Sequence, residues 1–293
     1  MSPYTFLASR LLFPLHEHLK GHDTVASLRE LELSQWWSPE RLLQAQARQL
    51  ETFVRAIVAR VPYFRERIDS RYITPAATPL PLLRALPITD KTEIRSHLDA
   101  WRSADAGPLA RHSTSGSSGE PLHFLLGKHR VSFDIAAKWR ATRWWNVDIG
   151  DREMVLWGSP IEVGTQDRIR ALRDQLLRSK LIGARDLDTK RMDEILAQML
   201  RYRPKMLFGY PSGLARIAAH ARQRGMDMRP AGVQVAFCTS EVLQPEWRHL
   251  IADTFGCGVA NEYGARDAGF IARECPHGGL HITAEEVIVE IVD

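Results

Sequence analysis

A short segment rich in serine and glycine is the first part of the chain whose residue types could bind an anion. Its six residues carry four hydroxyl groups and two glycines, and Glu120-Pro121 follows it. Glycine lets the backbone approach a ligand, and backbone N–H groups and hydroxyls donate hydrogen bonds to phosphate oxygens. The spacing and the lysine of a Walker loop are absent, and flexible linkers share this composition, so a phosphate loop and a linker both stay open. The segment consists of Thr114, Ser115, Gly116, Ser117, Ser118 and Gly119.

Two later segments continue an order of motifs that resembles the adenylate-forming enzymes, which include acyl-CoA synthetases, peptide-synthetase adenylation domains and luciferases. The segment 114–121 resembles the phosphate loop of that superfamily, and Cys238–Leu243 resembles its Gly-Glu-x-Leu turn beside the adenine and ribose. Asn261–Gly269 is similar to its Tyr-Gly-x-Thr-Glu-x-Gly motif. The resemblance implies that ATP is bound by Thr114, Ser115, Gly116, Ser117, Ser118, Gly119, Ser240, Glu241, Asn261, Glu262, Tyr263 and Gly264.

The third motif implies a role for an acidic residue and shows two departures from the family. The resemblance places Tyr263 against the adenine and Asp267 on the Mg²⁺ that accompanies ATP, with Thr114 and Ser115 beside it as catalytic residues. An aromatic face can stack on a base, and a hard carboxylate oxygen suits magnesium. Arg266 stands where the family usually has Thr or Ser, and Asp267 stands where it has Glu. Arginine could itself contact a phosphate or a carboxylate.

Within this superfamily, the chain resembles the phenylacetate-CoA ligase branch and the related CapK-like proteins of capsular-polysaccharide biosynthesis. The resemblance covers about residues 38–293 and rests on Arg60–Phe64, Leu86–Lys91, Phe208–Ser212 and Ile271–Cys275, followed by His281 and Glu286. It implies ATP- and Mg²⁺-dependent activation of a carboxylic acid, expected to be an aryl acid, as an acyl-adenylate. The acyl group would then pass to CoA, so the expected small-molecule partners are the acid, ATP and CoA.

The resemblance also suggests where the acid would bind. A bulky tryptophan at position 157 would favour a flat or aromatic acid, although tryptophans also fill protein cores, so both interpretations are open. The candidate pocket residues are Trp144, Trp145, Trp157, Gly158, Tyr210, Pro211 and Gly264.

Two other functions compete with CoA ligation. Members of the branch continue through a Gly-Asp motif, a hinge and a small C-terminal domain with a catalytic lysine, and no such segment follows Asp293. We therefore expect a truncated member whose activity in this form is open. Together with Arg266, this favours a non-catalytic nucleotide-binding or scaffold protein as one alternative. The other is an adenylating enzyme that transfers the acyl group to an amine or a sugar in surface-polysaccharide assembly.

The three cysteines suggest a reducing compartment and one further candidate metal site. Cys275 and His277, with His281 nearby, could ligate a structural Zn²⁺, with Cys238 or Cys257 as distant ligands. The spacing is not that of a standard zinc finger, so a turn with a buried cysteine is the other interpretation. An odd number of cysteines without a CxxC motif fits a cytoplasmic protein.

The composition is typical of a globular protein and argues against two classes of partner. The net charge is +4 over 293 residues, so the chain lacks the strongly basic character of a nucleic-acid-binding domain. No apolar run reaches the roughly 18 residues that a membrane-spanning helix needs. Basic residues are concentrated only between Arg168 and Arg185, which we interpret as a solvated helix face, with a phosphate- or CoA-binding patch as the alternative.

The elements that must position these residues alternate between two kinds of hydrophobic pattern. A long amphipathic helix is expected over 38–61, and four prolines favour an extended connector and a subdomain boundary over 70–90. Short apolar runs predict strands at Met154–Trp157, Met206–Tyr210, Val233–Phe237, Gly258–Tyr263 and Val287–Val292. Helical spacing predicts helices at Val131–Trp145, Asp188–Leu200, Pro211–Arg224 and Pro245–Phe255.

This alternation predicts an α/β fold with layered, largely parallel sheets flanked by helices. In the terms of the resemblance, it is an acyl-CoA synthetase-like N-terminal domain preceded by a helical segment. We expect a helical N-terminal subregion at 1–85 and an adenylate-forming α/β core, incomplete at its C-terminus, at 86–293. A homodimer is kept open.

Overall fold

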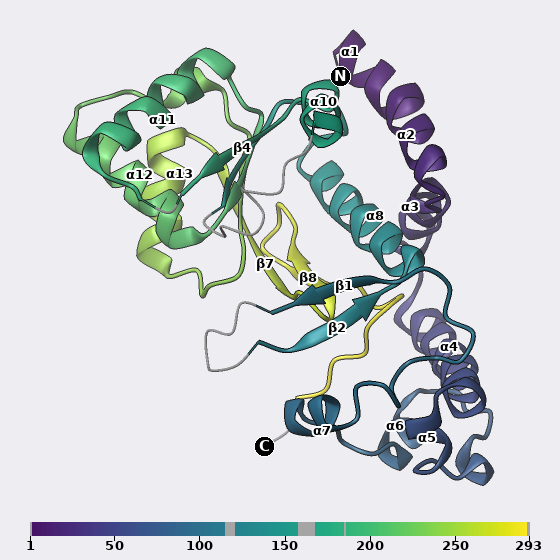
Figure 1. Ribbon diagram of the computed structural model, residues 1–293. Coiled ribbons are helices and arrows are strands. Elements are labelled where there is room, and N and C mark those ends of the chain that lie inside the picture. The colour runs from purple at the N-terminus through teal and green to yellow at the C-terminus, as the bar shows by residue number, and fades with distance from the viewer. Residues whose placement is uncertain (1, 115–120, 158–167, 185, 292–293) are drawn as a thin grey trace. The chain divides into compact units, whose positions relative to one another are not determined.

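The computed structural model describes residues 2–114, 121–157, 168–184 and 186–291, which form two compact units (Figure 1). Unit 1 comprises Met1–Gly21, Ala137–Ala265 and Phe270–Ile282, and unit 2 comprises His22–Ala136, Arg266–Gly269 and Thr283–Asp293. Among the described residues, no helix is both long and apolar enough to cross a membrane. The boundary expected between residues 85 and 86 stays a prediction.

Unit 1 is built on a seven-stranded sheet with the order β4-β3-β5-β6-β7-β8-β9. Its first five strands in this order pair in parallel, and β8 pairs antiparallel with β9. Four of the expected strands are confirmed, with ends shifted by at most two residues, and the mostly parallel α/β fold is therefore confirmed as well. The strands are β3 (Glu153–Trp157), β4 (Ser179–Gly183), β5 (Met206–Gly209), β6 (Val235–Cys238), β7 (Gly258–Ala265), β8 (Gly269–Glu274) and β9 (Leu280–Ile282).

The expected helices are also present, and two of their ends are capped. Asp188 accepts a hydrogen bond from the Arg191 N–H at the start of α11, and Gly256 ends α13 in the left-handed conformation with a φ of 64°. Unit 1 also contains three N-terminal helical segments, namely α1 (Pro3–Leu7), η1 (Ala8–Leu12) and α2 (Phe13–Lys20). The other helices are α8 (Lys128–Trp144), whose second half belongs to unit 1, α10 (Arg168–Leu176), α11 (Thr189–Tyr202), α12 (Pro211–Gln223) and α13 (Pro245–Phe255).

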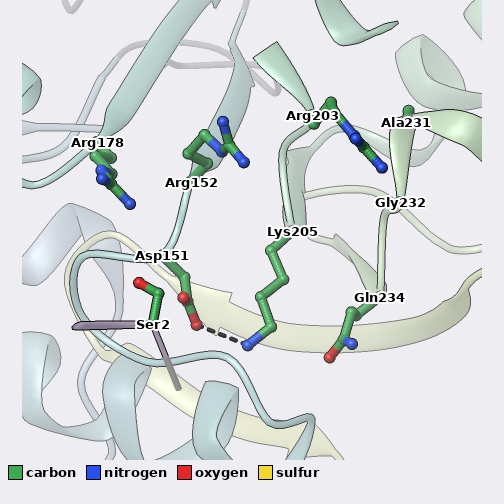
Figure 2. A pocket seen from close by; sticks show the side chains of 9 residues that line it. All are labelled: Ser2, Asp151, Arg152, Arg178, Arg203, Lys205, Ala231, Gly232 and Gln234. Carbon is green, nitrogen blue, oxygen red and sulfur yellow. Dashed lines mark hydrogen bonds and ion pairs between the residues drawn. The ribbon is translucent and has the colours of Figure 1, made fainter. Parts of the chain in front are cut away.

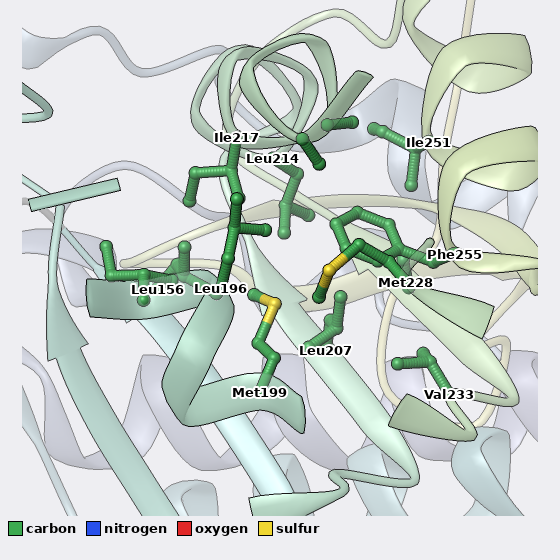
Figure 3. Packing of buried hydrophobic residues seen from close by; sticks show 14 of the residues in the cluster. Leu156, Leu196, Met199, Leu207, Leu214, Ile217, Met228, Val233, Ile251 and Phe255 are labelled. Carbon is green, nitrogen blue, oxygen red and sulfur yellow. The ribbon is translucent and has the colours of Figure 1, made fainter. Parts of the chain in front are cut away.

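Alternate residues of the central strands face two separate apolar layers. Leu207 on β5 belongs to a large cluster with side chains of α11, α12 and α13, whereas its neighbour Met206 belongs to a smaller cluster with Phe237 and Val147. Figure 3 shows the large cluster, including Leu156, Leu196, Met199, Leu214, Ile217 and Phe255. Both faces of the sheet are covered, as parallel sheets require.

Three strands of the sheet differ from the sequence expectations. Strand β4 lies inside the basic segment that was interpreted as a helix face, and only Ile182 of its five residues is buried, which explains its weak apolar pattern. Strand β8 ends in the charged residues Arg273 and Glu274, and the three residues of β9 are exposed, so neither strand was predicted. The strand expected at Val287–Val292 is wrong for the described residues 287–291, which are not in a strand. Val289 and Ile291 of this segment are exposed instead.

Unit 2 is largely helical and contains one two-stranded hairpin. The expected amphipathic helix is confirmed as α4 (Pro39–Arg60), whose N-cap Ser38 accepts a hydrogen bond from the Arg41 N–H. The connector 70–90 is not one extended segment, because the short helix α6 (Leu80–Ala85) interrupts it, and Leu82 of this helix packs on Val54 of α4. Further elements are α3 (Thr24–Ser34), α5 (Pro62–Arg65), η2 (Ser70–Tyr72), α7 (Lys91–Ser96), β1 (Ala110–Ser113) and β2 (His123–Leu126).

The tight approach of β5 to β3 gives a test of this sheet. A Cβ atom at Gly209 would lie 2.5 Å from the carbonyl oxygen of Leu156, whereas a Cβ at Gly213 would have no atom within 4 Å. We expect Gly209→Ala to lower the free energy of unfolding by about 1 to 3 kcal/mol, because backbone must move to admit the methyl group. Gly213→Ala, in helix α12, should raise it by about 0.5 to 1 kcal/mol. Denaturant unfolding measures both, and an unchanged midpoint for Gly209→Ala would contradict the packing described.

Candidate active site

The carboxyl ends of the parallel strands of unit 1 lie along one edge of the sheet and define the candidate site in this unit. Ligands of open α/β sheets bind in the crevice at this edge. Strands β3, β5 and β6 end at Trp157, Gly209 and Cys238, and each is followed by a segment that contains sequence-predicted site residues.

Aromatic rings gather where β3 and β5 end. The rings of Trp157 and Tyr210 are stacked with their centroids 4.7 Å apart, and Trp157 also stacks with Phe208 at 6.1 Å. Pro211 begins helix α12 directly after Tyr210 and is buried. The Trp157 Nε1 atom is buried and has no hydrogen-bond acceptor among the described residues. The structure thus brings three of the predicted acid-pocket residues together and adds Phe208, which alternates with Leu207 along β5.

The turn after β6 is tied to the start of α12. Thr239 donates its N–H to the Gly209 carbonyl, and the exposed Glu241 carboxylate accepts a hydrogen bond of 3.2 Å from the Ser212 N–H. Between them, Ser240 has a φ of 69°, a conformation that residues with a side chain rarely adopt. Glu241 therefore satisfies one of the free amides at the helix N-terminus and is placed at the same edge as Tyr210.

Trp144 and Trp145 lie elsewhere in unit 1 and do not join this aromatic group. Trp145 packs edge-on against Phe237 and donates its Nε1–H to the carbonyl oxygen of Glu274, while Trp144 packs against His281. A Cβ at Gly258, the first residue of β7, would collide with the Trp145 ring. Trp145 is therefore near the amino end of β7, away from its carboxyl end.

The predicted residues on β7 divide into a buried and an exposed set. Glu262 is 4% exposed and forms an ion pair of 2.6 Å with Arg273 of β8, whereas Tyr263 is 59% exposed and is followed by the exposed Gly264. The Asn261 N–H donates to the Glu274 carboxylate. Tyr263 and Gly264 are thus accessible to a ligand, and the Glu262 side chain is held in the sheet.

A second ion pair between distant residues joins helix α13 to strand β8. Arg248 of α13 donates from both terminal nitrogens to Glu274 of β8, at 3.1 and 2.8 Å, and also to the Val259 carbonyl. The sequence analysis missed this bidentate pair, because no short-range pattern links two residues that are 26 positions apart. Each of these two charged side chains thus has a partner of opposite charge, in the two-pronged geometry that favours such pairs.

In unit 2, the serine- and glycine-rich segment connects the two strands of the hairpin β1–β2. Ser115–Gly119 lie outside the described residues, as does Gly158 of the predicted acid pocket. The two flanking residues are paired: Thr114 donates its N–H to the Leu122 carbonyl, and the Leu122 N–H donates to Thr114 Oγ1 at 2.9 Å. The Arg266 guanidinium donates to the Ser113 carbonyl at 3.3 Å. Arg266 therefore joins the turn that contains the exposed Asp267 to the last residue of strand β1.

The cysteines do not form a metal site within the described part of the chain, where no group of three His, Cys, Asp or Glu residues could hold an ion. Cys275 closes a turn instead, with its N–H on the Gly279 carbonyl and its own carbonyl accepting from Gly278. Burial raises the pKa of both Cys238 and Cys257 to about 12. These two thiols are therefore protonated at neutral pH in the absence of a metal ion. The structure thus offers no support for the expected zinc ligation by Cys275 and His277.

The buried pair of Glu262 and Arg273 gives a test of what Glu262 does. We expect Glu262→Gln to lower the free energy of unfolding by about 3 to 5 kcal/mol, because it leaves the Arg273 charge buried without its partner. The double variant Glu262→Gln/Arg273→Met should recover a large part of this loss. Calorimetry of the two single variants and the double variant measures the coupling. Full stability of Glu262→Gln would show that the ion pair is not structural.

Comparison with known proteins supports the fold and part of the sequence analysis. No family model matches the chain. The chain is 23% identical over 265 residues to phenylacetate-coenzyme A ligase of Thermus thermophilus, an alignment that covers 87% of this chain and 58% of that protein. Among solved structures, 2-hydroxyisobutyryl-CoA ligase in complex with 2-HIB-AMP and CoA matches with a TM-score of 0.66 and 16% identity, over 83% of this chain and 54% of that one.

A second structure of that ligase, in its postadenylation state with R3-HIB-AMP, matches with a TM-score of 0.62 and 16% identity over 78% of this chain and 50% of that one. The chain thus spans little more than half the length of the proteins that it matches. The expected acyl-CoA synthetase-like fold is confirmed. The chain has the fold of the matched CoA-ligase structures and is similar in sequence, over most of its length, to a phenylacetate-CoA ligase.

Proposed function

We propose that this chain provides the ATP- and acid-binding part of a cytoplasmic acid-CoA ligase that works through an acyl-adenylate. The observation that carries the proposal is the placement of the resembling motifs at the ligand-binding edge of a sheet with a CoA-ligase fold. In that sheet, Tyr210 directly follows β5, Glu241 lies in the turn after β6, and Tyr263 lies near the carboxyl end of β7. One matched relative is named as a phenylacetate-CoA ligase. The other is named as a 2-hydroxyisobutyryl-CoA ligase, and its structure is in complex with R3-HIB-AMP.

In this proposal, the acid is an aryl acid that packs beside Trp157, Phe208 and Tyr210. Their rings form an apolar wall, and the buried Trp157 N–H can donate to a polar atom of the ligand. The substrate carboxylate attacks the α-phosphorus of ATP, which forms the acyl-adenylate and releases pyrophosphate. Such a step needs positioning and donors for phosphate charge more than it needs a nucleophile from the protein. The CoA thiol then attacks the acyl carbon, loses its proton, forms the thioester and displaces AMP.

The described residues fit a magnesium ion that accompanies ATP. Asp267 is exposed, and its carboxylate has no hydrogen-bond or ion-pair partner among the residues that the structure describes. Mg²⁺ is commonly held by one or two carboxylates together with substrate phosphates, whose charge it neutralises. Arg266 holds this turn on the hairpin base at Ser113, next to Thr114. We infer that Asp267 and the Thr114–Gly119 segment act together on the ATP phosphates, and that Arg266 positions them.

Removal of the Asp267 charge tests this assignment. We expect Asp267→Asn to reduce acid-dependent ATP–pyrophosphate exchange by about a hundredfold or more, a typical loss for one group that stabilises charge in a transition state. Asp227→Asn is the matched control, because Asp227 is also exposed and hydrogen-bonds only the nearby Arg229 N–H. The exchange rate of Asp227→Asn should stay within about twofold of the rate of the unmodified chain, because surface substitutions usually have small effects.

The assay should use aryl, fatty and amino acids, with CoA, an amine or a sugar as acceptor in a second step. Exchange that depends on an aryl acid, followed by formation of its CoA thioester, is the expected result. If exchange occurs and the acyl group is transferred only to an amine or a sugar, that compound replaces CoA as the acceptor in the proposal. A folded chain that binds neither ATP nor acid and shows no exchange would contradict the proposal and favour the scaffold alternative.

A further inference from the structure

A cavity of about 320 Å³ opens in unit 1 away from the aromatic group, and four of its nine lining residues are basic (Figure 2). We propose that it is a second anion site, which binds the diphosphate group of a small molecule. The site differs from the proposed adenylation site and requires none of its residues. The cavity is lined by Ser2, Asp151, Arg152, Arg178, Arg203, Lys205, Ala231, Gly232 and Gln234.

The topology of the sheet explains why these side chains meet. Arg152, Arg178 and Lys205 directly precede strands β3, β4 and β5, respectively. Because these strands are parallel and adjacent, their amino ends lie along one edge, opposite the edge that carries Trp157 and Tyr210. Three basic residues at equivalent positions thus converge on the same cavity, although they are up to 53 positions apart in the sequence.

The one acidic residue in the cavity is already satisfied. Asp151 accepts hydrogen bonds from Lys205 Nζ at 2.8 Å, Thr5 Oγ1 at 2.7 Å and the Asp148 N–H at 3.0 Å. Burial alone would raise the pKa of Asp151, but these hydrogen bonds together lower it below its usual value. Asp151 is therefore ionised and neutralises Lys205. The positive charges of Arg152, Arg178 and Arg203 remain uncompensated within the cavity.

Two of these guanidinium groups are available to a ligand. The guanidinium groups of Arg152 and Arg203 have no hydrogen-bond or ion-pair partner in the part of the chain that the structure describes. The Arg178 guanidinium lies 3.7 Å from the centre of the Tyr4 ring, and Tyr4 Oη donates to the Leu176 carbonyl. This packing fixes the direction of Arg178 and also covers the Tyr4 face, so that face cannot stack on a nucleobase.

The backbone at two of the arginines argues against a merely incidental cluster. Arg178 and Arg203 have φ angles of 54° and 51°, and the nearby Gly232 has a φ of 70°. The left-handed conformation is unfavourable for a residue with a Cβ, and glycine is the usual residue at such helix ends. Arginine at both positions is unfavourable for the local backbone. Such strain concentrates at functional sites, where the side chain has a use that offsets it.

The charge and the composition of the cavity select the ligand class. Guanidinium groups bind phosphate oxygens in a planar, two-pronged geometry, and three of them around one cavity suit more than one phosphate group. The cavity volume is within the usual range for a small ligand. None of the described residues that line the cavity is aromatic, so recognition depends on the diphosphate and not on stacking of a base. Inorganic pyrophosphate and ADP share this group and are the two sources to compare.

Calorimetric titration of the unmodified chain with inorganic pyrophosphate tests the proposal. We expect saturable binding that weakens by about tenfold or more in Arg152→Gln/Arg203→Gln, because charge-assisted hydrogen bonds are lost. The control Arg201→Gln/Arg216→Gln removes the same charge from two exposed arginines of unit 1 that also have no partner among the described residues, and its affinity should stay within about twofold. Arg203→Gly should lose affinity while its Tm stays equal or rises, since glycine relieves the left-handed backbone.

The outcomes separate binding at this site from a general effect of charge. ADP should bind within about threefold of pyrophosphate, and orthophosphate about tenfold more weakly. Equal weakening in the two double variants, or no saturable heat from pyrophosphate, would overturn the proposal. Binding of ADP that is tenfold tighter than that of pyrophosphate would overturn the assigned ligand class. The titration needs no turnover, so a failure of acid activation would leave its result intact.

Discussion

The parallel pairing of strands β3 and β5 is the constraint on which both candidate sites of unit 1 depend. It is close because Gly209 lets the β5 backbone approach Leu156 of β3. This pairing aligns the strand ends, so that Trp157 and Tyr210 meet at the carboxyl edge and Arg152 and Lys205 meet at the amino edge. A shift of register by one residue would reverse the faces of the β5 side chains and separate both groups.

The two edges of the sheet consequently differ in chemistry. The carboxyl edge offers aromatic rings, the start of helix α12 and the exposed Tyr263, which suit a flat acid and a nucleotide. The amino edge offers guanidinium groups over a small cavity, and the single carboxylate there is neutralised by Lys205. In the two proposals, the carboxyl edge therefore recognises the shape and apolar surface of a ligand as well as its charge, whereas the amino edge recognises almost only the charge of a ligand.

Much of unit 1 could be predicted from the sequence, because buried parallel strands read as short apolar runs between amphipathic helices. Strands β3, β5, β6 and β7 are of this kind. Strand β4 could not be predicted, because a single buried residue gives too little apolar pattern. The strand predicted at Val287–Val292 was wrong for residues 287–291, because their apolar side chains have no neighbouring strand among the described residues. The aromatic group was partly predicted through a resemblance. The pairs Arg248–Glu274 and Glu262–Arg273 and the basic cavity were not, because they depend on contacts between distant segments.

The turn Arg266–Gly269 shows how the two units share one functional segment. Its flanking strands, β7 and β8, belong to the sheet of unit 1, yet its own contacts lie in unit 2. Arg266 binds the hairpin at Ser113, and Gly269, with a φ of 77°, leaves room for Arg130, which a Cβ would displace. Asp267 lies between Arg266 and Gly269 and thus in the same unit as Thr114, as the proposed joint action on the ATP phosphates requires.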